Sequence, residues 1–255
     1  MKKTIIVVGL GELGSVFARG FLKLGHPVQG VTRNMDMQAI ANAIPSPEAI
    51  LVSVGEADIA ATLKTIPDVW KKQLILLQNE LLPRDWLAAN IEEPTIVSVW
   101  FEKKKGMDSK VVLPSPIYGA KSKLVFNALS QLDLPSYILD SEEELTYELV
   151  RKNLYILTTN IAGLKVGGNV EELLNTHYDV MQAVIQDVLD IQDYLTQSSN
   201  DREQLIKGLI EAIHGDLQHG CMGRSAPARL TRAIQFADKA GLKVPKLREI
   251  AEDLQ

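Results

Sequence analysis

The chain has 255 residues, of which 46% are hydrophobic, and it carries a formal net charge of -5. This length suits one large or two modest domains with a buried core, while the acidic balance disfavours binding to nucleic acid or to an anionic membrane surface. No apolar run is long enough to span a bilayer, and the single cysteine, Cys221, excludes an internal disulfide framework and is typical of a reducing compartment such as the cytoplasm.

The first predicted element is an apolar, β-branched strand over Thr4–Val8, which runs directly into a glycine-rich turn and then into a helical pattern. Three glycines stand at the G-x-G-x-x-G spacing of dinucleotide-binding turns. We expect Gly9 to form the tight turn, Gly11 to let a pyrophosphate approach the backbone, and Gly14 to let the helix pack closely on the strand. The free amides and positive dipole end of the helix would then face the phosphates. The predicted dinucleotide site comprises Gly9, Leu10, Gly11, Glu12, Leu13 and Gly14.

Short β-rich runs then alternate with helical segments up to about residue 140. After the first strand, the candidate strands are Val28–Thr32, Ala49–Val54, Gln73–Gln78, Thr95–Trp100 and Val111–Leu113. This alternation predicts a parallel sheet with crossover helices, that is, an α/β domain of the Rossmann type.

The last part of the chain has a purely helical pattern. The predicted helices are Glu142–Leu164, Glu171–Leu195, Asp201–His219 and Ala228–Ala240. Ser199 or Asn200 is the expected cap of the third of these helices, and Gly167-Gly168 and Gly241 are expected stops.

The chain is therefore predicted to contain two domains. Residues 1–141 would form the Rossmann-type domain, and residues 142–255 an all-α domain for the substrate or for dimerisation. Two-domain architectures of this kind place their ligand site in the cleft between the domains.

The end of the second predicted strand indicates which nicotinamide cofactor the turn would bind. NAD-binding units usually carry Asp or Glu there, about twenty residues after the glycines, to hold the ribose 2′-hydroxyl. This chain has Thr32, Arg33 and Asn34 instead, and the charged planar fork of an arginine can pair with a 2′-phosphate. We therefore predict NADP(H), with Thr32 and Arg33 in its site. Asp36 is the counterargument, because a longer turn would bring it to the ribose, and Arg33 would then be a solvated loop charge.

Two further segments carry a family resemblance: Gly25–Arg33 has the sequence GHPVQGVTR, and Leu74–Asn79 has the sequence LILLQN. Together with the glycine turn they resemble the ketopantoate reductase (2-dehydropantoate 2-reductase) family. The resemblance implies reduction of a 2-oxo acid to a 2-hydroxy acid with NADPH, between a Rossmann domain and a helical domain. It also implies that Arg33 meets the 2′-phosphate and that Asn79 lies near the nicotinamide. The alternative interpretation of Asn79 is a turn residue that caps a strand.

The helical half carries a second match, the sequence LVRKNLYILTTN over residues 149–160. It resembles the family's helix with a catalytic lysine and two asparagines. The resemblance places Lys152 on the lysine, Ile156 on the first asparagine and Asn160 on the second. Residues spaced by four lie on roughly one helix face. An ion pair with Glu148, four residues earlier, is the alternative role of Lys152.

Carbonyl reduction requires stabilisation of charge on the oxygen while hydride reaches the carbon, and then a proton. An ammonium group hydrogen-bonded to that oxygen can supply both. Lys152 and Asn160 are therefore the predicted catalytic residues.

A third family block matches incompletely. Gly215 stands where the family has a serine, His219 replaces an aspartate, and Pro227 or a near neighbour replaces a glutamate. Gly55 stands where a lysine is usual on the loop after the third strand. These departures fall on the substrate side, where lost polar partners reduce discrimination, so the sequence leaves the substrate open. The polar groups available for such a site are Lys152, Asn160, Asn79, Thr159, Ser225 and Arg224.

No metal site is predicted. His214, Asp216, His219 and Cys221 lie close in sequence but lack a second ligand pair at zinc-site spacing. A lone cysteine such as Cys221 is more often a small buried hydrophobe than a nucleophile. An apolar stripe of helical period indicates core or a subunit interface, and comprises Leu173, His177, Val180, Met181, Val184 and Val188.

The favoured function is an NADP(H)-dependent oxidoreductase that reduces a small 2-oxo acid or a related carbonyl. The alternative from another class is a catalytically silent NADP(H)-binding sensor or regulatory protein that has lost the family's substrate residues. A third option is the β-hydroxyacid dehydrogenase family, which shares the architecture. Its members carry a lysine and an asparagine four residues apart, whereas this chain has Lys152 and Ile156 at that spacing. The expected partner is a small carbonyl substrate, with a homodimer as the candidate assembly and no nucleic acid or membrane.

Overall fold

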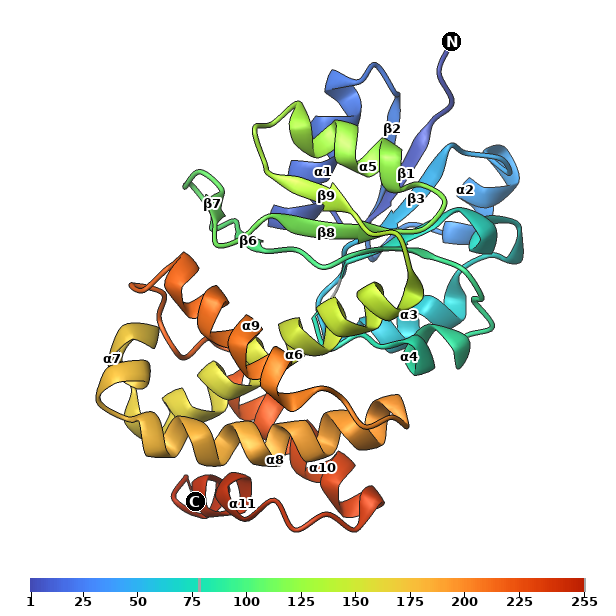
Figure 1. Ribbon diagram of the computed structural model, residues 1–255. Coiled ribbons are helices and arrows are strands. Elements are labelled where there is room, and N and C mark those ends of the chain that lie inside the picture. Colours follow the sequence, from blue (N-terminus) through green and yellow to red (C-terminus); the bar gives the residue numbers. More distant parts are fainter. Residues whose placement is uncertain (78, 255) are drawn as a thin grey trace. The chain divides into compact units, whose positions relative to one another are not determined.

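The computed structural model describes residues 1–77 and 79–254 and divides the chain into two compact units, Met1–Glu148 and Leu149–Gln255. Both are shown in Figure 1. The first unit is an α/β domain and the second is all-α, so the predicted fold class is confirmed. Within the described residues no helix combines the length and the apolar character needed to cross a membrane.

The first unit is built on a seven-stranded sheet with the order β2-β1-β3-β4-β5-β8-β9. The strands from β1 to β5 are parallel, β8 runs antiparallel to β5, and β9 is parallel to β8. Their bounds are β1 Ile5–Val8, β2 Val28–Val31, β3 Ala49–Val52, β4 Leu74–Leu76, β5 Thr95–Val97, β8 Ser115–Tyr118 and β9 Ser136–Ile138. A separate two-stranded sheet pairs β6 Phe101–Glu102 with β7 Lys110–Val111.

Helices cover this sheet because the central strands are apolar on both sides; β1 and β3, for example, are buried at every position. The helices of the unit are α1 Glu12–Lys23, α2 Met37–Ala43, α3 Ile59–Thr65, α4 Pro83–Leu87 and α5 Ser122–Ser130, with a 3-10 helix at Asp68–Gln73. α1 and α5 pack against each other on one face (Figure 1). They bury a core that includes Phe17, Phe21 and Leu129.

The second unit is all-helical. It contains the larger part of α6 Glu142–Val166, together with α7 Val170–Asn175, α8 Tyr178–Thr196, α9 Arg202–Gly215, α10 Ala226–Ala240 and α11 Pro245–Glu252. α7, α10 and α11 each pack on α8. Met181, Val184 and Val188 of the predicted apolar stripe are fully buried, so at these positions the stripe is core.

The division between the two units falls within a continuous helix. The sequence boundary lay before residue 142, whereas the compact units divide between Glu148 and Leu149, inside α6. The first two turns of α6 therefore belong to the α/β unit.

Several predicted elements differ in extent. The strand expected over Gln73–Gln78 is observed at Leu74–Leu76, with Gln78 outside the described residues. The single helix expected over Glu171–Leu195 is two helices, because α7 ends at Asn175 and α8 starts at Tyr178. The strand expected over Val111–Leu113 is observed as β7, Lys110–Val111, which pairs only with β6 outside the main sheet. β6, β8, β9 and α11 were not predicted.

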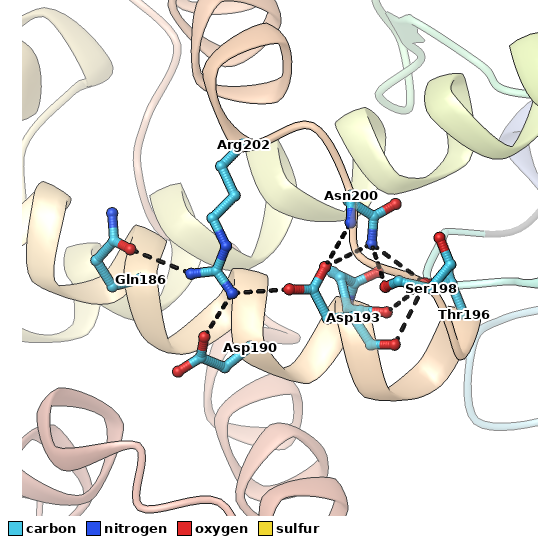
Figure 2. A network of polar contacts seen from close by, with 8 residues as sticks. Gln186, Asp190, Asp193, Thr196, Ser198, Asn200 and Arg202 are labelled. Carbon is cyan, nitrogen blue, oxygen red and sulfur yellow. Dashed lines mark hydrogen bonds and ion pairs between the residues drawn. The ribbon is translucent and has the colours of Figure 1, made fainter.

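The expected cap of α9 was also wrong. Asp201 is the N-cap, and its side chain accepts a hydrogen bond from the Gln204 amide at 3.0 Å. Asn200 instead donates from its amide and side chain to Asp193 Oδ1, at 3.0 and 2.7 Å (Figure 2). A carboxylate and a carboxamide are both good helix caps, so the sequence alone could not rank these neighbours.

Candidate functional site

The three glycines of the turn have different surroundings. Gly9 has a φ of 90°, and a Cβ there would lie 2.8 Å from the Ser53 carbonyl oxygen. At Gly14 a Cβ would lie 2.1 Å from the Gly9 oxygen, so only glycine lets α1 pack this closely on the turn. Gly11 is the N-cap of α1 and has no atom within 4 Å of the place of a Cβ. The turn is thus closed at Gly9 and Gly14 and open at Gly11.

A cavity of about 630 Å³ lies at the carboxyl ends of β1, β2 and β3. The strand order reverses beside β1, which is where open α/β sheets bind their ligands. Four of the predicted cofactor residues line it, namely Gly9, Gly11, Thr32 and Arg33. The structure therefore brings the glycine turn and the end of β2 together at one cavity.

Two carboxylates also line this cavity, and they are held differently. Asp36 caps α2, because its Oδ1 accepts hydrogen bonds from the amides of Gln38 at 2.9 Å and Ala39 at 3.0 Å. Asp58 accepts a hydrogen bond at 2.7 Å from Nη2 of Arg33, whose side chain is 87% exposed. Asp36, the sequence-based counterargument to NADP, is therefore engaged by backbone amides, and Asp58 is a neighbour of Arg33 that the sequence analysis missed.

Glu12 and Leu13 begin α1 beside the turn. Glu12 Oε2 lies 3.5 Å from Nζ of Lys103, in the segment between β6 and β7. The same ammonium donates to the Lys104 carbonyl at 2.9 Å and to the Met107 carbonyl. Lys103 therefore offsets a carboxylate that would otherwise repel a phosphate at this helix N-terminus.

Asn79 lies just after β4. Its Nδ2 donates to Glu56 Oε1 at 3.3 Å, and Glu56 follows Gly55 in the loop after β3. This hydrogen bond of Asn79 links the loops that follow β3 and β4. The location of Asn79 near a nicotinamide stays a prediction.

The predicted catalytic residues lie on α6 in the second unit. Lys152 is half-buried, while Ile156 and Asn160 are buried. At a rise of about 1.5 Å per residue, Lys152 and Asn160 stand roughly 12 Å apart along the helix axis. Ile156 therefore places an apolar side chain where the resemblance led us to look for an asparagine.

Asn160 has a buried ionic partner that the sequence analysis missed. Its Oδ1 accepts a hydrogen bond at 2.8 Å from Nη1 of Arg229 on α10, and Arg229 is only 8% exposed. Its Nδ2 lies 3.4 Å from Thr159 Oγ1. Arg229 stands two residues after Pro227, close to the place of the family's glutamate. Arg229 therefore places a positive charge near the position at which the resemblance implies a negatively charged glutamate.

The remaining polar candidates for the substrate site are Thr159, Ser225 and Arg224. Thr159 donates to the Tyr155 carbonyl of its own helix at 2.8 Å. Ser225 is the N-cap of α10, with no hydrogen bond from its side chain to that helix end, and Arg224 is exposed. Arg224 is the last residue of the segment 215–224, Ser225 follows it, and Gly215 at its start ends α9.

Cys221 has the character of a core residue. It is fully buried, and burial, with a smaller contribution from Glu172, raises the pKa of its thiol to about 11. It is therefore protonated near neutral pH and is a poor nucleophile. Across residues 1–77 and 79–254, no three His, Cys, Asp or Glu side chains gather as a metal site would require.

Comparison with solved structures provides the context for this geometry. A ketopantoate reductase from Ralstonia eutropha JMP134 aligns with a TM-score of 0.69 at 13% identity, over 97% of this chain and 95% of its own. A dimeric ketopantoate reductase from Staphylococcus aureus aligns with a TM-score of 0.67 at 14% identity, over 98% of both chains. The chain has the ketopantoate reductase fold.

A D-mandelate dehydrogenase, solved with NADH and anilino(oxo)acetate, shares this fold. It aligns with a TM-score of 0.68 at 14% identity, over 98% of this chain and 96% of its own. Neither a family profile nor a curated protein sequence matches the chain. The resemblance to ketopantoate reductases drawn from the sequence is thus confirmed as a likeness of fold over nearly the whole chain.

Proposed function

We propose that the protein is an NADP(H)-dependent reductase of a small 2-oxo acid or a related carbonyl compound, with Lys152 as electrophile and general acid. The observation that carries the proposal is the glycine turn, open at Gly11 onto a cavity that Thr32 and Arg33 line. The neighbours of the same fold are reductases and dehydrogenases, and one of them was solved with NADH and a 2-oxo acid derivative.

The residues present fit a nicotinamide dinucleotide. Gly11 leaves the backbone accessible at the start of α1, where free amides and the helix dipole favour phosphate. Arg33 presents a charged fork to a ribose 2′-phosphate, and Asn79 would lie near the nicotinamide. When bound, the coenzyme supplies the hydride.

Lys152 would polarise the substrate carbonyl by donating a hydrogen bond to its oxygen. As negative charge develops on that oxygen, the ammonium group stabilises it and then transfers a proton to it. Asn160 would assist through its carboxamide N–H, because its oxygen is already occupied by Arg229. Arg229 therefore fixes the orientation of Asn160.

Exchange of Lys152 for alanine tests this assignment. We expect Lys152→Ala to lower kcat/KM at least 100-fold, the scale of general acid catalysis, while NADPH still binds. The measurement is NADPH oxidation over a panel of 2-oxo acids that begins with ketopantoate. Lys207→Ala, at an exposed lysine on α9, is the control and should keep wild-type turnover. If Lys152→Ala binds NADPH and leaves turnover of every accepted substrate unchanged, the mechanism is wrong.

A second candidate is a nucleotide-binding protein without chemistry, which uses NADP(H) as a regulatory ligand. Buried Ile156 at the place of an asparagine, and the tie between Asn160 and Arg229, favour it. Robust NADPH-dependent turnover of any acid in the panel would eliminate this candidate. For assembly we propose a homodimer, in line with the dimeric neighbour from Staphylococcus aureus.

A further inference from the structure

Asp58 occupies an unusual position beside the cofactor cavity. It is the N-cap residue of α3, yet its side chain makes no hydrogen bond to the amides of that helix. Aspartate is among the best capping residues, so this side chain forgoes a favourable local contact. It reaches Arg33 instead, with 2.7 Å between Oδ2 and Nη2.

Asp58 and Arg33 therefore form a pair at the place where a ribose 2′ substituent would lie. Both residues line the cavity, and both side chains are well exposed, at 46% and 87%. An exposed pair of this kind contributes only about 0 to 1 kcal/mol, so a ligand can displace it. Gly55 also lines the cavity, at the position where the family resemblance implies a lysine, so this position supplies no second positive charge beside Arg33.

We infer that Asp58 sets the cofactor preference of the site, by competing with a 2′-phosphate for Arg33 and by accepting a hydrogen bond from an unphosphorylated ribose. The inference rests on the proposed function. The protein then accepts NADH as well as NADPH, although no acidic residue ends β2.

The physical basis is the charge of the two ligands. A phosphate monoester carries about -1.5 to -2 charges near neutral pH, so it attracts Arg33 but is repelled by the carboxylate that Arg33 already holds. A ribose 2′-hydroxyl is neutral and can donate to that carboxylate. Asp36 adds a further negative charge to the lining, but the α2 amides stabilise it in place.

The decisive variant is Asp58→Asn, which removes the charge and keeps the size and the capping ability of the side chain. Dissociation constants for NADP⁺ and NAD⁺ are measured by calorimetry on the full chain, at low and at high salt. Asp68→Asn is the matched control, because Asp68 is a 91% exposed carboxylate of the same unit that pairs with Lys71 outside the cavity lining.

We expect Asp58→Asn to tighten NADP⁺ binding about fivefold at low salt, to leave NAD⁺ binding equal or weaker, and to lose most of this difference at high salt. Asp68→Asn should bind both nucleotides as the wild type does. Equal or weaker NADP⁺ binding by Asp58→Asn would overturn the inference, because Asp58 would then serve to position Arg33. A wild-type protein that binds neither nucleotide would instead overturn the proposed function, and the inference with it.

Discussion

Gly11 and Gly14 differ in what surrounds the missing side chain, and this difference separates folding from binding. At Gly14 a methyl group would overlap the Gly9 carbonyl oxygen, which cannot move without opening the turn. At Gly11 the same group meets nothing, and φ is -72°. We expect Gly14→Ala to lower the free energy of unfolding by about 1 to 3 kcal/mol, and Gly11→Ala to lower it by less than about 1 kcal/mol.

Gly11→Ala should weaken nucleotide binding more than it lowers stability, although it destabilises the fold less than Gly14→Ala. In Gly11→Ala the methyl group fills open space at the start of α1, where the pyrophosphate would approach the backbone, so NADP⁺ affinity should fall at least tenfold in a fully folded protein. Urea unfolding and calorimetry on the two variants provide both numbers. Wild-type affinity in Gly11→Ala would show that the pyrophosphate does not pass this residue.

Residue spacing predicted the local parts of the site but not its long-range pairs. The glycines and Arg33 follow from motifs in which a few neighbouring residues form one turn. Asp58 is 25 positions from Arg33, and Arg229 is 69 positions from Asn160, so only the packing of separate elements brings these partners together. Nothing in the spacing of these residues marks the two pairs.

The turn between α8 and α9 depends on a small ionic network (Figure 2). Arg202, the first residue of α9, donates to Asp190 and to Asp193 of α8, both at 2.7 Å. Burial raises the pKa of Asp193, but the hydrogen bonds from Asn200 and Arg202 outweigh burial and hold that pKa below its usual value. The carboxylate form of Asp193 is thus stabilised in the folded protein.

Exchange of Arg202 for methionine should therefore destabilise the protein in a pH-dependent way. A depressed folded-state pKa contributes stability that is present above the unfolded value of about 3.9 and is lost as the pH falls through the folded value. We expect Arg202→Met to cost about 1 kcal/mol at pH 7, a value discounted for partial exposure, and less at about pH 3. Urea titrations at both pH values provide the test, with Lys207→Met as the control on the same helix.

A cost for Arg202→Met that is the same at both pH values would contradict this account, because the carboxylates would then not respond to the arginine. Lys207→Met should be near neutral throughout, since Lys207 is exposed.

Elements with a strong local pattern were predicted, and elements that depend on distant partners were not. The first five strands of the sheet follow from apolar runs, and α6 and α10 follow from their period. β9 is short and partly exposed, with the sequence Ser136-Tyr137-Ile138, so no apolar run marks it. The start of α11 is held by the buried Asp187 of α8, which accepts from the amides of Lys246 at 2.7 Å and Leu247 at 3.0 Å. A cap supplied by another helix leaves no local signal.

At the scale of the whole molecule, the cavity beside the glycine turn belongs to the first unit, and Lys152 and Asn160 belong to the second. Binding of the nucleotide should therefore be separable from chemistry. A ligand at 100 times its Kd stabilises the folded state by about 2.7 kcal/mol, which for a chain of this size raises Tm by roughly 5 to 10 °C. We expect this NADP⁺-induced shift in the wild type and, nearly unchanged, in Lys152→Ala.

Arg33→Ala provides the contrast within the first unit. It removes the one cation that lines the cavity in the described part of the chain, so the shift caused by NADP⁺ should fall to a third or less, while the shift caused by NAD⁺ should change little. Differential scanning fluorimetry of the three proteins with both nucleotides makes the comparison. If Lys152→Ala lost the NADP⁺-induced rise in Tm and Arg33→Ala kept it, the nucleotide would bind through the helical unit. The assignment of nucleotide binding to the first unit would then be wrong.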